Sequence, residues 1–214
     1  EHRGLYQNIR GAEKMKIIFL GDSITEGGRD RSDPASLGSE YVDLFYNKLR
    51  NLYENTAFTV LNRGVSGDRI ADMAARLDTD VLSEKPDAVI LLAGVNDVVR
   101  EPSGKKFDAD AFAAVYEDVL KRIKESGARL IVAEPFLFAV PDKKRFRRDF
   151  DAALKKIRAL ALEYADAHVA LDEIFAGVSQ NAGIAAYSPD GVHPTHRAER
   201  LIADNVIKKL AAFL

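Results

Sequence analysis

The sequence Lys16-Ile17-Ile18-Phe19-Leu20-Gly21-Asp22-Ser23 predicts a strand that ends at a glycine and is followed at once by a serine. Its apolar residues are consecutive rather than alternating, which is typical of a parallel strand that helices cover on both faces. In an open α/β sheet, ligands bind beyond the carboxyl ends of the strands. We therefore expect Ser23 to lie at the edge of the sheet where a functional site would be.

Four more short runs rich in Val, Ile and Leu predict further strands of the same kind, at 58–62, 88–93, 129–133 and 168–171. Segments with an apolar stripe at helical spacing alternate with the strands, at 41–52, 70–82, 112–123, 146–160 and from about Thr195 onward. This alternation predicts a single α/β domain of three layers, in which a five-stranded parallel sheet lies between two layers of helices.

The composition is that of an ordinary globular protein and argues against several classes of partner. Acidic and basic residues nearly balance, with a formal net charge of -2, so neither a nucleic-acid footprint nor a membrane-surface patch is predicted. No apolar run reaches the ~20 residues that cross a bilayer. The chain has no cysteine, which excludes disulfides, thiolate chemistry and cysteine-ligated zinc.

The first residues of the chain are polar and differ from the rest. Residues 1–14 contain no apolar segment of the kind found in signal peptides, and Met15 stands directly before the first predicted strand. We expect residues 1–14 to be a leader or a disordered N-terminus, and residues 15–214 to form the single domain. Since no signal peptide is visible, the expected location is the cytoplasm.

Ser23 has two interpretations. With Glu26 three residues later it has the spacing of a capping box, so its side chain could simply begin a helix. As a nucleophile it would instead gain the N-terminus of that helix, whose backbone N–H groups can bind an oxyanion. The residues around Ser23 do not decide between the two.

Near the other end of the chain, Asp190 and His193 place a carboxylate and an imidazole three residues apart in a turn. With Ser23 they make up the groups that a hydroxyl nucleophile needs: an attacking oxygen, a base, and an acid that orients the base. A rigid turn before a helix is the simpler alternative, and Asp190, His193 and His196 could also bind a metal ion. No other His or Cys cluster offers a further ligand, so no metal site is predicted.

Two more predicted loops at this edge carry groups suited to binding an oxyanion. In the loop 62–68, Gly67 offers a backbone N–H and lets a substrate approach closely, although a simple turn with a positive φ would also explain this glycine. In the loop 93–97, the side-chain amide of Asn96 could donate to the oxyanion, or the asparagine could only form the turn. Each signal is weak by itself, but four such loops at one edge of one sheet strengthen one another.

The four loops together resemble the conserved blocks of the SGNH, or GDSL-type, hydrolases. They read Gly-Asp-Ser-Ile at 21–24, Ser-Gly-Asp at 66–68, Gly-Val-Asn-Asp at 94–97 and Asp-Gly-Val-His at 190–193. The resemblance covers nearly the whole chain from Met15 onward. It implies a flavodoxin-like α/β/α fold with strand order 2-1-3-4-5, and hydrolysis of esters without a metal or an organic cofactor.

The resemblance also implies a role for each of the residues above. It assigns Ser23, His193 and Asp190 to a catalytic triad, and the backbone N–H groups of Ser23 and Gly67 with the Asn96 amide to an oxyanion hole. Within the family, the runs 21–29, 37–42 and 62–67 are similar to a bacterial branch that contains acetyl-xylan esterases.

The chain departs from that branch in its aromatic residues. The branch commonly has tryptophans after the Asn-Asp pair and just before the catalytic Asp, where this chain has Val98-Val99 and Pro189, and the chain has no tryptophan at all. Trp is a favoured platform for stacking sugars, so a preference for long polysaccharides is not expected. The residues expected to line the substrate site in its place are Tyr187, Phe136, Phe138 and Asp22, the last of which is also expected to stabilise its turn.

We therefore predict a serine esterase that hydrolyses short-acyl esters, above all acetyl esters of carbohydrates, through an acyl-enzyme. The alternatives are a lysophospholipase-like or thioesterase-like acyl hydrolase and, more distantly, a metal-dependent hydrolase or a non-catalytic flavodoxin-like binding module. The expected partner is a small-molecule or oligosaccharide ester rather than a nucleic acid or a membrane. A homo-oligomer is compatible with the sequence.

Overall fold

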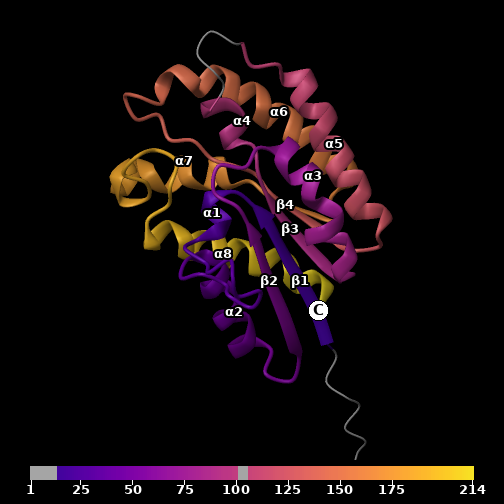
Figure 1. Cartoon of the computed structure of the whole chain (residues 1–214). Coiled ribbons are helices and arrows are strands. Elements are labelled where there is room, and N and C mark those ends of the chain that lie inside the picture. Colours follow the sequence, from indigo (N-terminus) through magenta and orange to yellow (C-terminus); the bar gives the residue numbers. More distant parts are fainter. Residues whose placement is uncertain (1–13, 101–105) are drawn as a thin grey trace, which may run out of the picture.

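The computed structural model describes residues 14–100 and 106–214, and a parallel sheet lies at its centre (Figure 1). The strands are β1 (Lys14–Gly21), β2 (Ala57–Gly64), β3 (Ala88–Leu92), β4 (Arg129–Ala133) and β5 (Ala167–Val169). The α-helices are α1 (Ser23–Glu26), α2 (Tyr41–Leu52), α3 (Ile70–Asp80), α4 (Val95–Val99), α5 (Ala109–Glu125), α6 (Arg147–Tyr164), α7 (Leu171–Ala182) and α8 (His196–Leu210). Short 3₁₀ helices are η1 (Leu82–Glu84), η2 (Lys144–Phe146), η3 (Ile184–Ala186) and η4 (Ala211–Phe213).

The sheet has five parallel strands in the order β2-β1-β3-β4-β5, which confirms the predicted α/β fold class and the strand order 2-1-3-4-5. The order reverses at β1, so the loop after β1 lies at the topological switch point of the sheet. At the end of β1, Gly21 is paired with Gly64 on one side and with Leu92 on the other. Ser23 and the loops after β2 and β3 therefore lie at one edge.

Helices cover both faces of the sheet. The helices α2 and α8 pack against each other on one face, and α3, α5 and α6 form a layer on the other (Figure 1). Their apolar stripes supply the two halves of the core, as the helical spacing predicts. Within residues 14–100 and 106–214, no helix is both long and apolar enough to span a membrane.

The core explains why β1 is a continuous apolar run. Its residues Ile17, Ile18, Phe19 and Leu20 are fully buried because helices lie above and below them. The Phe19 ring meets Tyr41 and Phe45 of α2 edge-on, with centroids 5.6 and 4.8 Å apart. Truncating such a ring to alanine typically costs about 3–5 kcal/mol of stability.

The structure differs from the predicted elements in two helices, α4 and α7, and in one strand. The strand predicted at 168–171 is β5, but it ends at Val169, and Leu171 already begins α7. The helix α4 is only about one turn long, too short to show a helical period, and α7 follows β5 so closely that its first apolar residue extended the strand pattern. The segment 1–13 lies outside the described residues, and Lys14, assigned to the leader, is the first residue of β1.

Candidate active site

Ser23 is the first residue of α1, and its hydroxyl does not cap that helix. The N-cap is Asp22, whose Oδ1 accepts the N–H of Ile24 at 3.0 Å. The interpretation of Ser23 as the capping residue is therefore wrong, because an aspartate one position earlier already satisfies the free N–H. The half-buried Ser23 side chain is left available for another partner at the edge of the sheet.

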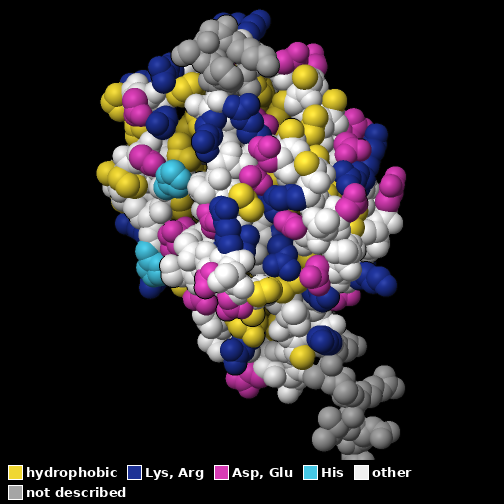
Figure 2. Space-filling model, viewed as in Figure 1, with side chains coloured by type: hydrophobic (Ala, Val, Ile, Leu, Met, Phe, Trp, Pro, Cys, Tyr) yellow, Lys and Arg dark blue, Asp and Glu magenta, His cyan; other side chains and the backbone are white. Residues whose placement is uncertain are grey.

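That partner is His193, which lies in the loop between η3 and α8. Its Nε2 is 3.1 Å from Ser23 Oγ, and its Nδ1 is 2.6 Å from Asp190 Oδ2. When Nδ1 donates its proton to Asp190, Nε2 presents a lone pair to the serine hydroxyl. The structure thus joins the three predicted residues in one hydrogen-bonded chain, which is the arrangement that a base-activated nucleophile needs. Exposed histidine side chains are visible on this side of the molecule, next to α7 and α8 (Figure 2).

Asp190 is held and kept ionised by its own turn. Its Oδ1 accepts the N–H groups of Val192 and His193 at 2.9 and 2.8 Å. Partial burial works to raise the pKa of Asp190, but the hydrogen bonds from the His193 imidazole and from these two N–H groups outweigh it and lower the pKa to about 2. The carboxylate is therefore charged near neutral pH, and it stabilises a positive charge on His193 whenever one forms.

The predicted oxyanion donors lie in the segments that follow β1, β2 and β3. Within the part of the chain that the structure describes, no acceptor takes the backbone N–H of Ser23 or of Gly67. Gly67 has a φ of +86°, a conformation that favours glycine. The buried Asn96 amide donates through Nδ2 to the Asp68 carbonyl at 3.0 Å, and its other contact, with Asp22 Oδ2, is long at 3.4 Å. One amide hydrogen is thus weakly bound and suited to a stronger acceptor.

Asp22 is completely buried, and the prediction that it lines the substrate site is wrong. It has no exposed surface that could meet a ligand, because its side chain lies beneath the loop that carries Ser23 and faces Ile24 and Asn96. Burial raises the pKa of Asp22 to about 7, although the hydrogen bond from Ile24 acts in the opposite direction. The residue shapes the turn, as the sequence also suggests.

The aromatic candidates lie together, but not as an open platform. Tyr187 is 3 % exposed and packs against Phe175 with Arg197 over its ring, so it presents almost no surface for stacking, and its role toward substrate stays a prediction. Phe136 and Phe138 contact Phe175 as well, and they form part of the wall of a hollow of about 340 Å³. That wall contains none of the triad residues, so a role for these two rings toward substrate stays a prediction.

His196 is not part of the triad, because it is paired with a different carboxylate. Its Nδ1 lies 3.2 Å from Glu199 Oε2, one turn further along α8, while His193 is paired with Asp190. Among residues 14–100 and 106–214, no three or more His, Cys, Asp or Glu side chains are close enough to share a metal ion. The alternative grouping of Asp190, His193 and His196 as ligands is therefore not formed.

One residue that the sequence reasoning passed over, Asn62, holds the active-site loops in place. It is buried, and its Nδ2 donates to the carbonyl oxygens of Thr25 and Leu37 at 2.7 and 2.9 Å, while its Oδ1 accepts the N–H of Gly64 at 2.9 Å. The sequence signal for Asn62 is an amide side chain at the end of the predicted strand 58–62. A buried amide there must have partners, and the nearest unpaired groups are those of neighbouring loops.

Comparisons with known proteins show the family to which the chain belongs. The model of the GDSL-like lipase/acylhydrolase family matches residues 19–201. An acetylxylan esterase of Geobacillus stearothermophilus is 28% identical over 204 residues, which are 91% of this chain and 93% of that protein. A crystal structure of a putative GDSL-like lipase from Parabacteroides merdae is 27% identical, with a TM-score of 0.88 over 94% of this chain and 97% of the other.

The acetylxylan esterase Axe2 from Geobacillus stearothermophilus is also similar in structure. Its crystal structure is 27% identical, with a TM-score of 0.85 over 93% of this chain and 95% of Axe2. Structures are known for three variants described as catalytic mutants of Axe2, in which a serine, an aspartate or a histidine is replaced by alanine. Other variants replace tryptophans, and Axe2 is there called an acetyl-xylooligosaccharide esterase or an acetyl xylan esterase.

Proposed function

Because the chain belongs to the GDSL-like lipase/acylhydrolase family and is a carboxylic ester hydrolase, we propose that it removes short acyl groups, above all acetyl groups, from carbohydrates through a Ser-His-Asp triad. The observation that carries the proposal is the hydrogen-bonded chain from Asp190 through His193 to Ser23. The same three residue types are changed in the catalytic mutants of Axe2, which supports the assignment.

In the first step, Ser23 Oγ attacks the ester carbonyl while His193 Nε2 takes its proton. Charge then builds on the imidazole, and the ionised Asp190 stabilises it from the side of Nδ1. The tetrahedral intermediate collapses when the alkoxide oxygen of the sugar receives the proton back from Nε2 and leaves as the alcohol. The acyl group remains on Ser23 as an ester.

The oxyanion that forms in this step is bound on the other side of Ser23. Its donors are the weakly engaged hydrogen of Asn96 Nδ2 and the N–H groups of Ser23 and Gly67, which have no acceptor among the described residues. The turn at Asp22 and the hydrogen bonds of Asn62 to Thr25 and Gly64 hold the loops after β1 and β2 in place. Little reorganisation is therefore needed when charge develops.

The second step releases the acid. A water molecule takes the place of the departed alcohol, gives its proton to His193 Nε2 and attacks the acyl carbonyl. Collapse of this second intermediate returns the proton to Ser23 Oγ and frees the carboxylic acid. The same oxyanion donors serve both steps, because the carbonyl oxygen stays in one place.

The proposed substrate class is supported by the similarity to known esterases and by one difference from them in aromatic residues. The similarity to an acetylxylan esterase favours acetylated sugars. Tryptophans occur in Axe2 at positions that have been varied, whereas this chain has none, and its Tyr187 ring is buried. Without a stacking platform, we expect short acetylated oligosaccharides to be better substrates than a long polymer.

The test is the release of acetate from acetylated xylooligosaccharides, from acetylated xylan and from acetylated monosaccharides, each at equal acetyl content. The proposal predicts the highest kcat/KM on the small sugars and a lower value on the polymer. A rate on xylan equal to or above that on the oligosaccharides would contradict the size preference, and release from none of them would contradict the carbohydrate assignment.

A further inference from the structure

Arg100 ends α4 and lies on the same side of this helix as Asn96. It is four residues after Asn96, and its backbone N–H donates to the Asn96 carbonyl at 3.1 Å. Residues at this spacing are neighbours on a helix surface. The side chain of Arg100 is exposed, so it projects from the helix that carries the amide donor of the oxyanion hole.

The Arg100 guanidinium lies against Gly67. Its Nη1 takes up the place that a β-carbon on Gly67 would need, and its Cζ is only 3.1 Å from that position. Two features therefore favour glycine at position 67: its φ of +86°, and the guanidinium, which fills the space that a side chain would need. A cation thus stands beside the N–H group that we propose as an oxyanion donor.

No carboxylate in the described part of the chain pairs with this guanidinium, and Asp68 and Asp97, which follow Gly67 and Asn96 in the chain, have other partners. Asp68 is held by Arg76 at 2.8 Å, and Asp97 accepts the N–H of Ile70 at 3.2 Å with each of its oxygens. The backbone carbonyl of Arg100 is itself fixed by the side chain of Arg69. The main chain of Arg100 is thus anchored, while its planar set of N–H donors has no acceptor among residues 14–100 and 106–214.

A guanidinium with free donors is suited to bind a carboxylate, because its fork of N–H groups matches the two oxygens. We propose that Arg100 forms a carboxylate-binding subsite beside the oxyanion hole, so that this esterase prefers esters that carry a carboxylate close to the bond being cleaved. The proposal rests on the proposed function, since it takes Ser23 and Gly67 as the point at which the ester binds.

The carboxylate has two sources. It belongs either to the alcohol, as in an acetylated uronic acid, or to the acyl group, as in a hemisuccinate. Two matched pairs of substrates separate them: acetylated glucuronic acid against acetylated glucose, and 4-nitrophenyl hemisuccinate against 4-nitrophenyl butyrate, whose acyl chains have the same number of carbons. In each pair, the ratio of kcat/KM for the charged ester to that for the neutral ester measures the preference.

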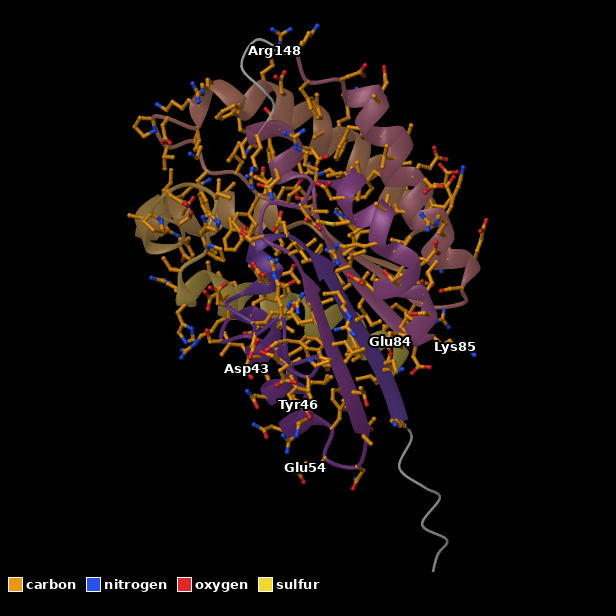
Figure 3. All side chains as sticks on the ribbon, viewed as in Figure 1. Asp43, Tyr46, Glu54, Glu84, Lys85 and Arg148 are labelled. Atoms are coloured by element: carbon orange, nitrogen blue, oxygen red, sulfur yellow. The ribbon has the colours of Figure 1, made fainter. Side chains whose placement is uncertain are left out.

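The proposal predicts that this ratio falls about tenfold in Arg100→Gln for at least one pair, the loss of one charge-assisted contact at an exposed site. Arg100→Lys should retain part of the preference, because the charge remains without the fork. The matched control is Arg50→Gln, which removes the same charge from over the Tyr46 ring on α2, far from α4 (Figures 1 and 3). The control should keep the ratio of the parent.

Salt gives a second readout that does not depend on a variant. At 1 M salt the Debye length is about 3 Å, so the preference of the parent enzyme should shrink. The inference is overturned if both ratios are the same in the parent and in Arg100→Gln, including the case in which Arg100→Gln slows the charged and neutral esters equally. If the parent hydrolyses none of the four esters, the proposed function itself fails, a result distinct from the loss of a ratio.

Discussion

Ser23 Oγ and His193 Nε2 are 3.1 Å apart although 170 positions separate the two residues along the chain. Ser23 follows β1, which lies between β2 and β3, and His193 lies in the loop that leads into α8. The contact makes the serine the first residue whose replacement should abolish activity.

Ser23→Ala should reduce ester hydrolysis to background and leave the thermal unfolding midpoint nearly unchanged, because it removes one half-buried hydroxyl that caps no helix. A serine-directed phosphonate should label the parent and not this variant, as mass spectrometry would show. The control is Ser83→Ala, which changes an exposed serine beside Glu84, at the far end of the sheet from α1 (Figure 3). Retained turnover in Ser23→Ala would rule out the proposed nucleophile.

His193→Ala and His196→Ala form a matched pair within one loop and helix start. The first should lower kcat by ~10⁴-fold or more, because the base is lost, whereas the second should have a far smaller effect because His196 is paired with Glu199. EDTA should not change the rate of the parent. Inhibition by EDTA that Zn²⁺ reverses would point instead to a metal site at Asp190, His193 and His196.

Asn96→Ala should lower kcat by ~10²–10³-fold with little change in KM, because the amide bonds most strongly to charge that exists only in the transition state. Steady-state kinetics on one acetyl ester would measure both constants. The control Asn205→Ala removes an amide that donates to the Leu201 carbonyl within α8. An effect of Asn96→Ala on KM alone would mean that Asn96 binds the ground state and the transition state equally.

Acyl length should limit activity. We expect kcat/KM to be highest for acetyl esters, lower for butyryl esters and much lower for octanoyl esters of the same alcohol. A small acyl pocket rejects long chains by steric conflict, while an open apolar groove could gain up to ~0.8 kcal/mol for each added methylene that it buries. A rate that climbs with chain length would favour the lysophospholipase-like or thioesterase-like alternative.

Asp22→Asn should change how stability depends on pH. A carboxyl group whose pKa is about 7 in the folded protein and 3.8 when unfolded takes up a proton on folding, so its contribution favours the folded state at low pH and is lost as the pH rises from about 4 through 7. The difference in unfolding free energy between Asp22→Asn and the parent should therefore shift in favour of the variant by about 3 kcal/mol between pH 4.5 and pH 8.

Urea unfolding of both proteins at these two pH values measures that difference, and the other titrating groups cancel because they are shared. The conservative change keeps a side-chain oxygen for the N–H of Ile24, so the cap of α1 is retained. A difference that stays constant between the two pH values would show that Asp22 titrates at the same pH in the folded and unfolded chain.

Much of the fold was readable because its signals are local. Consecutive apolar residues predicted each of the five strands, and apolar stripes predicted α2, α3, α5, α6 and α8, since strand burial and helical period are properties of neighbouring residues. The order of the four polar loops also indicated the triad and the oxyanion donors. The helix α4 was missed because one turn shows no period. The helix α7 was missed, and β5 was placed too far along, because α7 follows β5 closely and begins with a leucine.

The sequence by itself thus determined the layers, the strand positions and the chemical types that gather at one edge of the sheet. Only the tertiary structure decided which side chain does what there: that Asp22 rather than Ser23 caps α1, that Tyr187 is buried, and that the Arg100 guanidinium lies on Gly67. These outcomes depend on segments distant in sequence that compete for the same space and hydrogen-bond partners. Such competition is settled by packing in three dimensions, and no local pattern records it.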